Sequence, residues 1–299
     1  MITAGSILTN IMNSINETSR DKHGAIILAA ISRAYKMDVV NEHWWTETMR
    51  LFKPTNTVSS STNQPIVLPA EFIRMRSVHD ANYTYYEDST RGKSPVRPYN
   101  WYHDEPVKTP LQEGSGANAE KDSAVVDLSD SGLVVDASAA GEWIHIGQSD
   151  DVYQILTRDS DTQVTLTRNF RTVEAARNVA WQIRPVGCKR IVLCDQAGTI
   201  LSATDLVCEY QCSPMSVISE QDILELPDAA ANAVLNKALM YSMQRKGWAR
   251  AASALESEYR HALALAKRAC PASRETMVPK RLFKRPNSSS FGFKESWVQ

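Results

Sequence analysis

Apolar residues recur at helical spacing near the start of the chain. Two such runs flank a break at Asn16–Arg20, and their apolar positions are Ile7, Leu8, Ile11, Met12 and Ile15, then Ile26, Ile27, Ala30, Ile31, Ala34 and Tyr35. Residues three or four apart lie on one face of a helix, so the runs predict two amphipathic helices. A third amphipathic piece follows through Trp44, Trp45, Thr48 and Leu51. Its two adjacent tryptophans are also compatible with a strand.

A second helical pattern begins after Leu226–Pro227–Asp228. Proline at a helix start and an acid in the first turn suit the exposed N–H groups and the positive end of the helix dipole. This helix carries the apolar stripe Val234, Leu235, Ala238, Leu239 and Tyr241. Past the C-cap glycine Gly247, a further helix repeats the apolar residues Ala252, Leu255, Tyr259, Ala262 and Ala266 before Pro271. The short turn between the two helices predicts an antiparallel hairpin.

The middle of the chain has the pattern of a β-meander. Its clearest strand signals are Trp143–Ile146, Val152–Leu156 and Gln163–Thr167, with turn residues between them. Further short strand signals follow one another at intervals of roughly 10 residues from Ala124 to Cys212. Such spacing predicts a small antiparallel barrel or sandwich. The fold class is therefore α+β, with a helical bundle formed by the N- and C-terminal helices and a β unit inserted between them.

These patterns divide the chain into four parts. Residues 1–110 contain the N-terminal helices and a segment of aromatic strands, and residues 111–222 form the inserted β domain. Residues 223–271 form the C-terminal helical hairpin that completes the core, and residues 272–299 form an extended basic and aromatic tail. A length of 299 residues fits a core domain with an inserted second unit.

The charge of the chain is unevenly distributed. The net charge of the chain is −1. Its C-terminal part, Gln244–Gln299, contains 12 Lys or Arg against 4 Asp or Glu, a balance of +8, so residues 1–243 carry −9. An acidic body thus ends in a basic tail. Neither a signal peptide nor an apolar run long enough for a membrane helix is present, so we expect a protein made in the cytoplasm without a membrane partner.

Candidate chemistry is sparse. The five cysteines, at 188, 194, 208, 212 and 270, include only one pair at zinc-ligand spacing, and we expect buried, reduced thiols rather than a zinc site. The acidic pairs Asp150–Asp151 and Asp159–Asp161 are typical of turns, with calcium binding as the alternative. No nucleophile and base can be nominated together. We therefore expect no enzyme, no metal and no cofactor.

The tail combines cations with spaced aromatic residues. It runs from Pro279 to Gln299, and its candidate docking residues are Arg281, Phe283, Arg285, Phe291, Phe293 and Trp297. Aromatic anchors on a flexible basic strand suggest a segment that folds onto an acidic, grooved partner surface. A solvated, disordered tail and a nucleic-acid contact through phosphates are the alternatives.

The order of the motifs resembles that of a known family. Leu68–Phe72 is an "LP" strand segment, and Gly141–Ile144 and Asp161–Leu166 belong to the β insertion. In the hairpin Leu226–Arg268, an Ala-rich helix opening with Leu-Pro-Asp leads to the turn Arg245–Gly247 and a second helix. Together these features resemble the head-to-tail adaptors of tailed bacteriophages, the neck or connector proteins of the tail tubular protein A class. The resemblance spans most of the chain.

This resemblance implies a structural virion protein of the neck and tail that is assembled in the host cytoplasm. Members of the adaptor family form homo-oligomeric rings, commonly dodecameric, which dock under the portal protein. These rings continue the DNA channel and carry the tail nozzle, tube or fibre proteins. Genomic DNA passes through the lumen without sequence-specific binding. The helical bundle then packs between neighbouring subunits and against the portal, and the apolar residues expected at the subunit contacts are Leu235, Leu239, Leu255 and Tyr259.

Two other functional classes remain open from the sequence. Another tail structural protein, such as a tail-tube, terminator or fibre-joining protein, also has a β-meander. A carbohydrate-binding module would use Trp101, Tyr102 and Trp143 as stacking faces.

Overall fold

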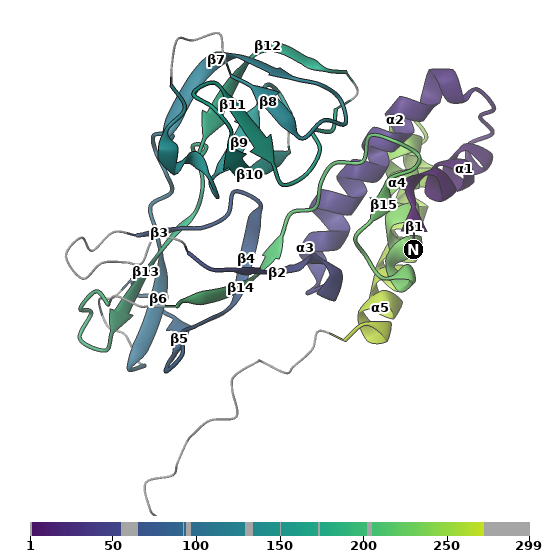
Figure 1. The fold of residues 1–299 in the computed structure, drawn as a ribbon. Helices are drawn as coiled ribbons and strands as arrows, with labels where there is room; N and C mark the ends of the chain where they lie inside the picture. The colour runs from purple at the N-terminus through teal and green to yellow at the C-terminus, as the bar shows by residue number, and fades with distance from the viewer. Residues whose placement is uncertain are drawn as a thin grey trace, which may run out of the picture.

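The computed structural model describes residues 2–54, 65–91, 93, 97–128, 134–149, 151–172, 174–201 and 205–271. The chain has a mixed α+β fold that includes a closed six-stranded barrel. Figure 1 shows three regions: the barrel, a second sheet below it, and the helices beside both. The predictions of an α+β fold and of a small antiparallel barrel are therefore confirmed.

The N-terminal helices follow the predicted pattern closely. Helix α1 (Ala4–Ser14) and helix α2 (Arg20–Arg33) flank the predicted break, where Asn16 adopts a left-handed conformation with a φ of 54°. Helix α2 continues into a π-helical turn, Ala34–Val39, and a short α3 (Val40–Glu42). The third amphipathic helix is absent. A 3₁₀ turn, Thr46–Thr48, leads instead into strand β2 (Met49–Phe52).

The C-terminal hairpin also lies where the apolar spacing placed it. A 3₁₀ turn, Asp228–Ala230, follows Pro227 and leads into α4 (Ala231–Arg245). Gly247 has a φ of +78°, which L-residues with a side chain rarely adopt, and it ends the turn before α5 (Ala249–Ala269). The glycine thus reverses the chain between the two helices.

Helices from both ends of the chain contribute to one hydrophobic core. The buried apolar residues at its centre come from α1, α2, the π-helical turn, α4 and α5, and include Leu8, Ile11, Ile31, Ala34, Val234, Ala238, Ala262 and Ala266. Because α4 contacts α1, α2 and α5, it lies at the middle of this core. A two-stranded sheet of β1 (Ile2–Thr3) and β15 (Ile223–Leu224) joins the N-terminus to the segment before α4.

The barrel consists of six antiparallel strands in the order β10-β11-β8-β7-β12-β9. Their bounds are β7 Gln112–Ala119, β8 Val125–Asp127, β9 Trp143–Ile146, β10 Val152–Arg158, β11 Gln163–Leu166 and β12 Ala176–Ile183. A 3₁₀ turn, Ala137–Ala139, precedes β9. Alternate side chains along β9 and β11 are buried, so the barrel has its own core around Ile144, Val164 and Trp181. The three strands predicted most clearly form β9, β10 and β11.

The remaining strands form a seven-stranded sheet in the order β2-β14-β4-β5-β6-β13-β3. The strands not yet given are β3 Ile66–Val67, β4 Phe72–His79, β5 Thr84–Glu87, β6 Tyr99–Asp104, β13 Arg190–Asp195 and β14 Val207–Cys212. Here the structure corrects the sequence-based boundary of the β domain at 111–222. Strands β13 and β14 lie within that range, yet they pair with β6, β3, β2 and β4 rather than with the barrel.

This difference has a physical reason. Strand β13 is rich in apolar residues, and β14 alternates apolar with polar residues as the barrel strand β11 does. Such a pattern identifies a strand without identifying its partner. The register is fixed by contacts between distant residues. One of these is the cross-strand ion pair between Arg190 and Asp104, with N and O 2.7 Å apart.

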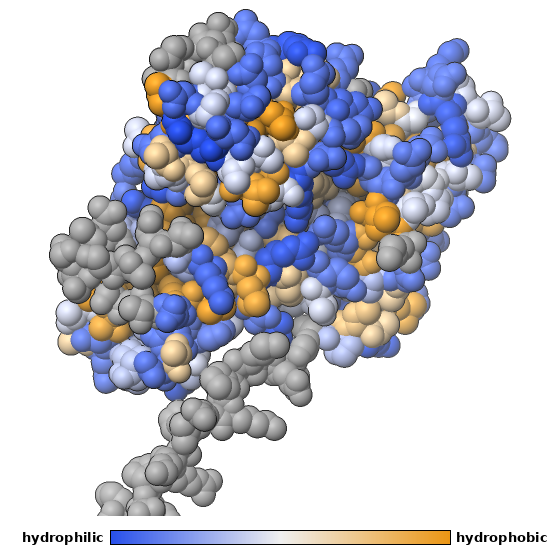
Figure 2. All heavy atoms as spheres, viewed as in Figure 1, coloured by the Kyte–Doolittle hydropathy of each residue, from blue (hydrophilic) through white to orange (hydrophobic). Residues whose placement is uncertain are grey.

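The surface is mostly polar. Figure 2 shows hydrophobic residues scattered among hydrophilic ones on the face that it presents. The more exposed large apolar side chains come from separate elements, among them Met37, Leu51, Leu156 and Leu265. Within the described residues, no helix combines the length and the apolar character that crossing a membrane requires.

All five cysteines are free thiols. Cys188, Cys194, Cys208 and Cys212 are buried, and Cys270 is half-buried at the end of α5. The prediction of buried, reduced thiols is therefore confirmed for the first four. Burial raises the pKa of Cys208 and of Cys212 to about 12, and that of Cys188 to about 11.

Thiol reactivity is expected to follow this burial. Because the thiolate is the nucleophile, the four buried cysteines should resist a thiol reagent at mildly alkaline pH, and only Cys270 should react in the folded protein. All five should react in denaturant. Counting modified thiols by mass spectrometry measures this, and Cys270→Ser should abolish the reaction of the folded chain. Fast modification of Cys208 or Cys212 in that variant would contradict the burial described here.

Candidate functional site: a charged fissure between the barrel and the body

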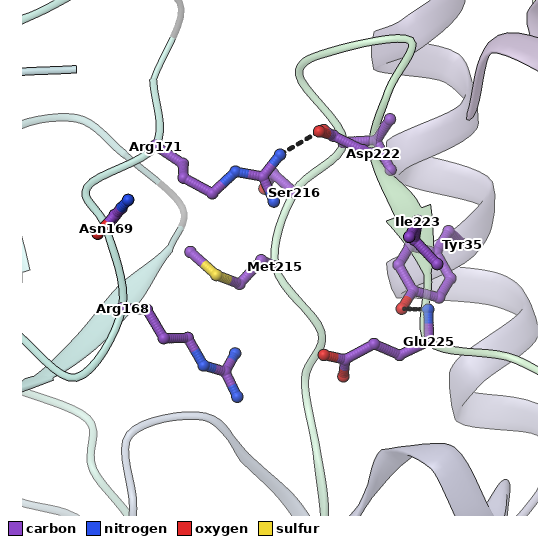
Figure 3. A pocket seen from close by; sticks show the side chains of 10 residues that line it. Tyr35, Arg168, Asn169, Arg171, Met215, Ser216, Asp222, Ile223 and Glu225 are labelled. Atoms are coloured by element: carbon purple, nitrogen blue, oxygen red, sulfur yellow. Dashed lines mark hydrogen bonds and ion pairs between the residues drawn. The ribbon is translucent and has the colours of Figure 1, made fainter. Parts of the chain in front are cut away.

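Two cavities lie along the boundary between the barrel and the rest of the chain, and we call this boundary the fissure. One cavity in it, of about 290 Å³, lies between the loop after β11 and the segment that leads to β15 (Figure 3). The residues that line this cavity are Tyr35, Arg168, Asn169, Arg171, Met215, Ser216, Val217, Asp222, Ile223 and Glu225. Charged side chains of both signs therefore face one another across it.

An ion pair between Arg171 and Asp222 crosses this fissure (Figure 3). Asp222 is buried and also accepts backbone hydrogen bonds from Ile218, at 2.8 Å, and from Ser219, at 3.0 Å. These donors hold the carboxylate in place. Arg171 comes from the barrel loop, so the pair fastens the barrel to the segment before β15.

A second ion pair joins the barrel to the helices. Lys36 in the π-helical turn lies with its Nζ 2.8 Å from Oδ1 of Asp151, at the start of β10. Their side chains are only 11% and 5% exposed. Ser216 completes the cluster, because its N–H donates to Asp151 and its Oγ contacts both partners. Removing water from around two charges costs free energy that only such a complete set of contacts offsets.

The sequence predicts a turn acid at Asp151, with calcium binding as the alternative. The structure gives it a different role, as the buried partner of Lys36. Its neighbour Asp150 lies outside the described residues. Among the residues that are described, no group of three or more His, Cys, Asp or Glu side chains is arranged to hold a metal ion.

A second cavity, of about 170 Å³, lies between β2 and the outside of the barrel. Glu71 forms part of its wall and is buried, and it accepts a hydrogen bond of 2.9 Å from the hydroxyl of Tyr210. Arg50 lines the same cavity and pairs with Glu225, at 2.7 Å. Burial raises the pKa of Glu71 above its ordinary value. The Tyr210 hydrogen bond and the charges of Arg168 and Arg50 lower this pKa, but they offset the effect of burial only in part.

Arg168 lines both cavities. It lies just beyond β11 and is exposed. Among the described residues it makes no hydrogen bond or ion pair, in contrast to Arg171 and Lys36 at the other side of the fissure. In Figure 3 its guanidinium extends toward the segment that carries Glu225. Two ion pairs thus cross the fissure at one side, and among the described residues none crosses it at the side of Arg168.

The stability of the chain should depend on pH through Glu71. Below about 4.5 the carboxyl is protonated in both the folded and the unfolded chain. As pH rises above this value the unfolded chain ionises first, so the folded state loses stability. Glu71→Gln keeps a neutral side chain that can accept from Tyr210. The variant should match the native melting temperature near about pH 4 and exceed it near about pH 7.

A surface glutamate provides the matched control for this measurement. Lys108 donates a hydrogen bond to Glu105 and lowers the pKa of that carboxyl. Ionisation of Glu105 therefore stabilises the folded chain, whereas ionisation of Glu71 destabilises it. Glu105→Gln should therefore give no gain in melting temperature at neutral pH. If Glu71→Gln were destabilised by the same amount at both pH values, the proposed cost of ionising Glu71 would be ruled out.

The residues nominated from the sequence lie elsewhere. The six docking residues of the tail, Arg281, Phe283, Arg285, Phe291, Phe293 and Trp297, fall outside the described residues. Of the four nominated for subunit contacts, Leu239 and Tyr259 are buried inside the chain, and Leu235 and Leu255 pack against the same core. Because side chains that fill the core of one chain are not available to a neighbour, Leu239 and Tyr259 do not make subunit contacts. A subunit contact through the half-buried Leu235 and Leu255 stays a prediction.

The carbohydrate-binding alternative loses one of its stacking faces. Trp101 is only 4% exposed and packs edge-on against His103 in the core of the seven-stranded sheet. A buried ring cannot stack on a sugar. Tyr102 and Trp143 are half-buried and lie on different units, the sheet and the barrel.

Sequence reasoning did not find the charged residues of the fissure. Lys36 and Asp151 are 115 positions apart, and Arg171 and Asp222 are 51 apart. The one available signal was Lys36, a cation next to the apolar stripe that contains Ala34 and Tyr35. A cation at such a position is more often solvated, so its buried partner could be identified only from the structure.

No protein-family model matches this chain, and a search of curated proteins finds no match.

Proposed function

We propose that this chain is a structural virion protein of a tailed bacteriophage, a head-to-tail adaptor that forms a ring under the portal. The observation that carries the proposal is the architecture. Helices from both ends of the chain contribute to one core, and a closed barrel is inserted between them. The motif order that resembles the adaptor class falls on this framework, with Leu226–Pro227–Asp228 directly before α4.

In this proposal the helices at the two ends form the bundle of the adaptor. The bundle packs between neighbouring subunits and against the portal, through side chains other than the buried Leu239 and Tyr259. The basic tail that follows Pro271 is the docking segment, with its aromatic residues as anchors and its cations setting the register. The barrel faces outward or toward the tail components.

The charge distribution supports a role beside DNA. Residues 112–183, which contain all the barrel strands, have five Lys or Arg against twelve Asp or Glu, a balance of −7. Most of the acidic excess of residues 1–243, which carry −9, is therefore concentrated in the barrel. Where the barrel faces the tail components beside the channel, its carboxylates repel phosphates and let DNA pass without adhering.

The proposal is tested by mixing the purified chain with the portal ring of its phage and imaging the product by electron microscopy. A second ring stacked coaxially under the portal is the expected result. Self-assembly into tubes or trimers without portal binding would favour another tail structural protein. The absence of any assembly in either condition would contradict a ring-forming adaptor.

A further inference from the structure

The barrel is attached to the rest of the described chain, which we call the body, through a narrow neck. Because its strands occupy the continuous stretch 112–183, the chain enters it through residues 105–111 and leaves it through residues 184–189. These two segments hydrogen-bond to each other, with N–O distances of 2.9 Å from Val107 to Cys188 and from Gly187 to Val107. Gly187 has a φ of +93° and open space around the position of a Cβ. The neck is therefore thin compared with the units it joins.

Beyond the neck, the barrel is held to the body at one side of the fissure. The two ion pairs described above, Lys36 with Asp151 and Arg171 with Asp222, make this contact together with Met215, which packs against the barrel core. We call the two ion pairs the clamp. Both acids also accept backbone hydrogen bonds, from Ser216 and from Ile218 and Ser219. The clamp and the neck together define two fixed points.

At the other side of the fissure, no ion pair between described residues joins the barrel to the body. Arg168 of the barrel and Glu225 of the body line the same cavity of about 290 Å³ as the clamp residues Arg171 and Asp222. Glu225 is held by Arg50 from the body side. Arg168 lowers the pKa of Glu71 through its charge, but among the described residues no acid lies within ion-pair distance of it. A guanidinium and a carboxylate that face each other across a cavity attract, and closing the gap would pair them.

We propose that the barrel is a hinged arm, which turns on the neck and the clamp and closes the fissure by bringing Arg168 onto Glu225. The open and closed forms differ by one exchange of ion pairs, in which Arg168 competes with Arg50 for the same carboxylate. The Arg50–Glu225 and Arg168–Glu225 pairs are both partly exposed, so replacing one by the other changes the ratio of open to closed chains by only a few-fold. Both forms are then accessible to the folded chain. The inference concerns a single chain and holds whether or not that chain is an adaptor.

Electron spin resonance distances between the two units test this hinge. The reporter positions are Leu156→Cys on β10 and Leu265→Cys on α5, whose native side chains are 58% and 49% exposed. They are introduced together with Cys270→Ser, which leaves only the four buried native thiols. Spin labels at the two positions then report how the barrel lies relative to the helices.

Arg50→Gln is the decisive variant. It frees Glu225 from its present partner, so the closed form, seen as a second distance, should increase by about two- to fivefold. Adding Arg168→Gln should return the distribution to that of the native chain. Arg158→Gln removes a barrel arginine whose partner is Asp161, on the same unit, and should change nothing. An unchanged, single narrow distance in Arg50→Gln, with a normal melting curve, would overturn the hinge.

Discussion

Removal of Pro279–Gln299 is expected to leave a folded chain that no longer binds the portal ring. The described residues end at Pro271, and the buried core residues among them end at Ala266, so the truncation removes none of these. The segment removed carries the cations and aromatic residues proposed for docking. The thermal midpoint should therefore stay unchanged while co-sedimentation with the portal ring is lost.

Two full-length variants separate the contributions of the tail. Replacing Phe283, Phe291, Phe293 and Trp297 by serine keeps every charge and should abolish docking if the aromatic residues are the anchors. Replacing Arg281 and Arg285 by glutamine keeps the aromatic residues and should mainly slow association and change its salt dependence. Normal assembly by the truncated chain would remove the docking role of the tail.

Trp181→Ala is expected to lower the free energy of unfolding by about 3–5 kcal/mol. Trp181 is 1% exposed and lies in the core of the barrel. Its ring packs directly over Gly114 of the neighbouring strand, where an added Cβ would come within 2.8 Å of the ring. Removing the indole opens a cavity that the surrounding strands cannot fill without breaking their register, and chemical denaturation measures the loss.

The matched control is Trp248→Ala, in the turn between α4 and α5. This ring is 45% exposed and contacts Lys246, so the same substitution should change the free energy of unfolding by no more than about 0.5 kcal/mol. A similar cost for the two variants would show that Trp181 is not the packing centre described here. A large loss for Trp181→Ala alone supports the closed barrel.

Elements fixed by local patterns could be predicted from the sequence. The alternation along Trp143–Ile146 and the spacing of Ile7, Leu8 and Ile11 identify a strand and a helix without reference to the rest of the chain. The left-handed turn at Gly247 follows from the same kind of local rule. Strand and helix positions near these signals were therefore correct to within a few residues.

Contacts between distant residues could not be predicted in this way. Strand β13 could have joined the barrel or the sheet, and its pairing with β6 depends on residues some 90 positions away in sequence. The same holds for the clamp, because nothing near Lys36 in the sequence indicates Asp151. The apolar stripes of α4 and α5 lie where their spacing predicts, and their buried side chains, among them Leu239 and Tyr259, pack within the chain.

The most direct test of the proposed function is the mass of the purified full-length chain, measured by light scattering alone and after mixing with the portal ring of its phage. A monomer of 33.3 kDa that adds to the portal as one complete ring, commonly twelve copies in the class it resembles, is the predicted result. A chain that stays separate from the portal, or assembles by itself into tubes or trimers, would contradict the adaptor function.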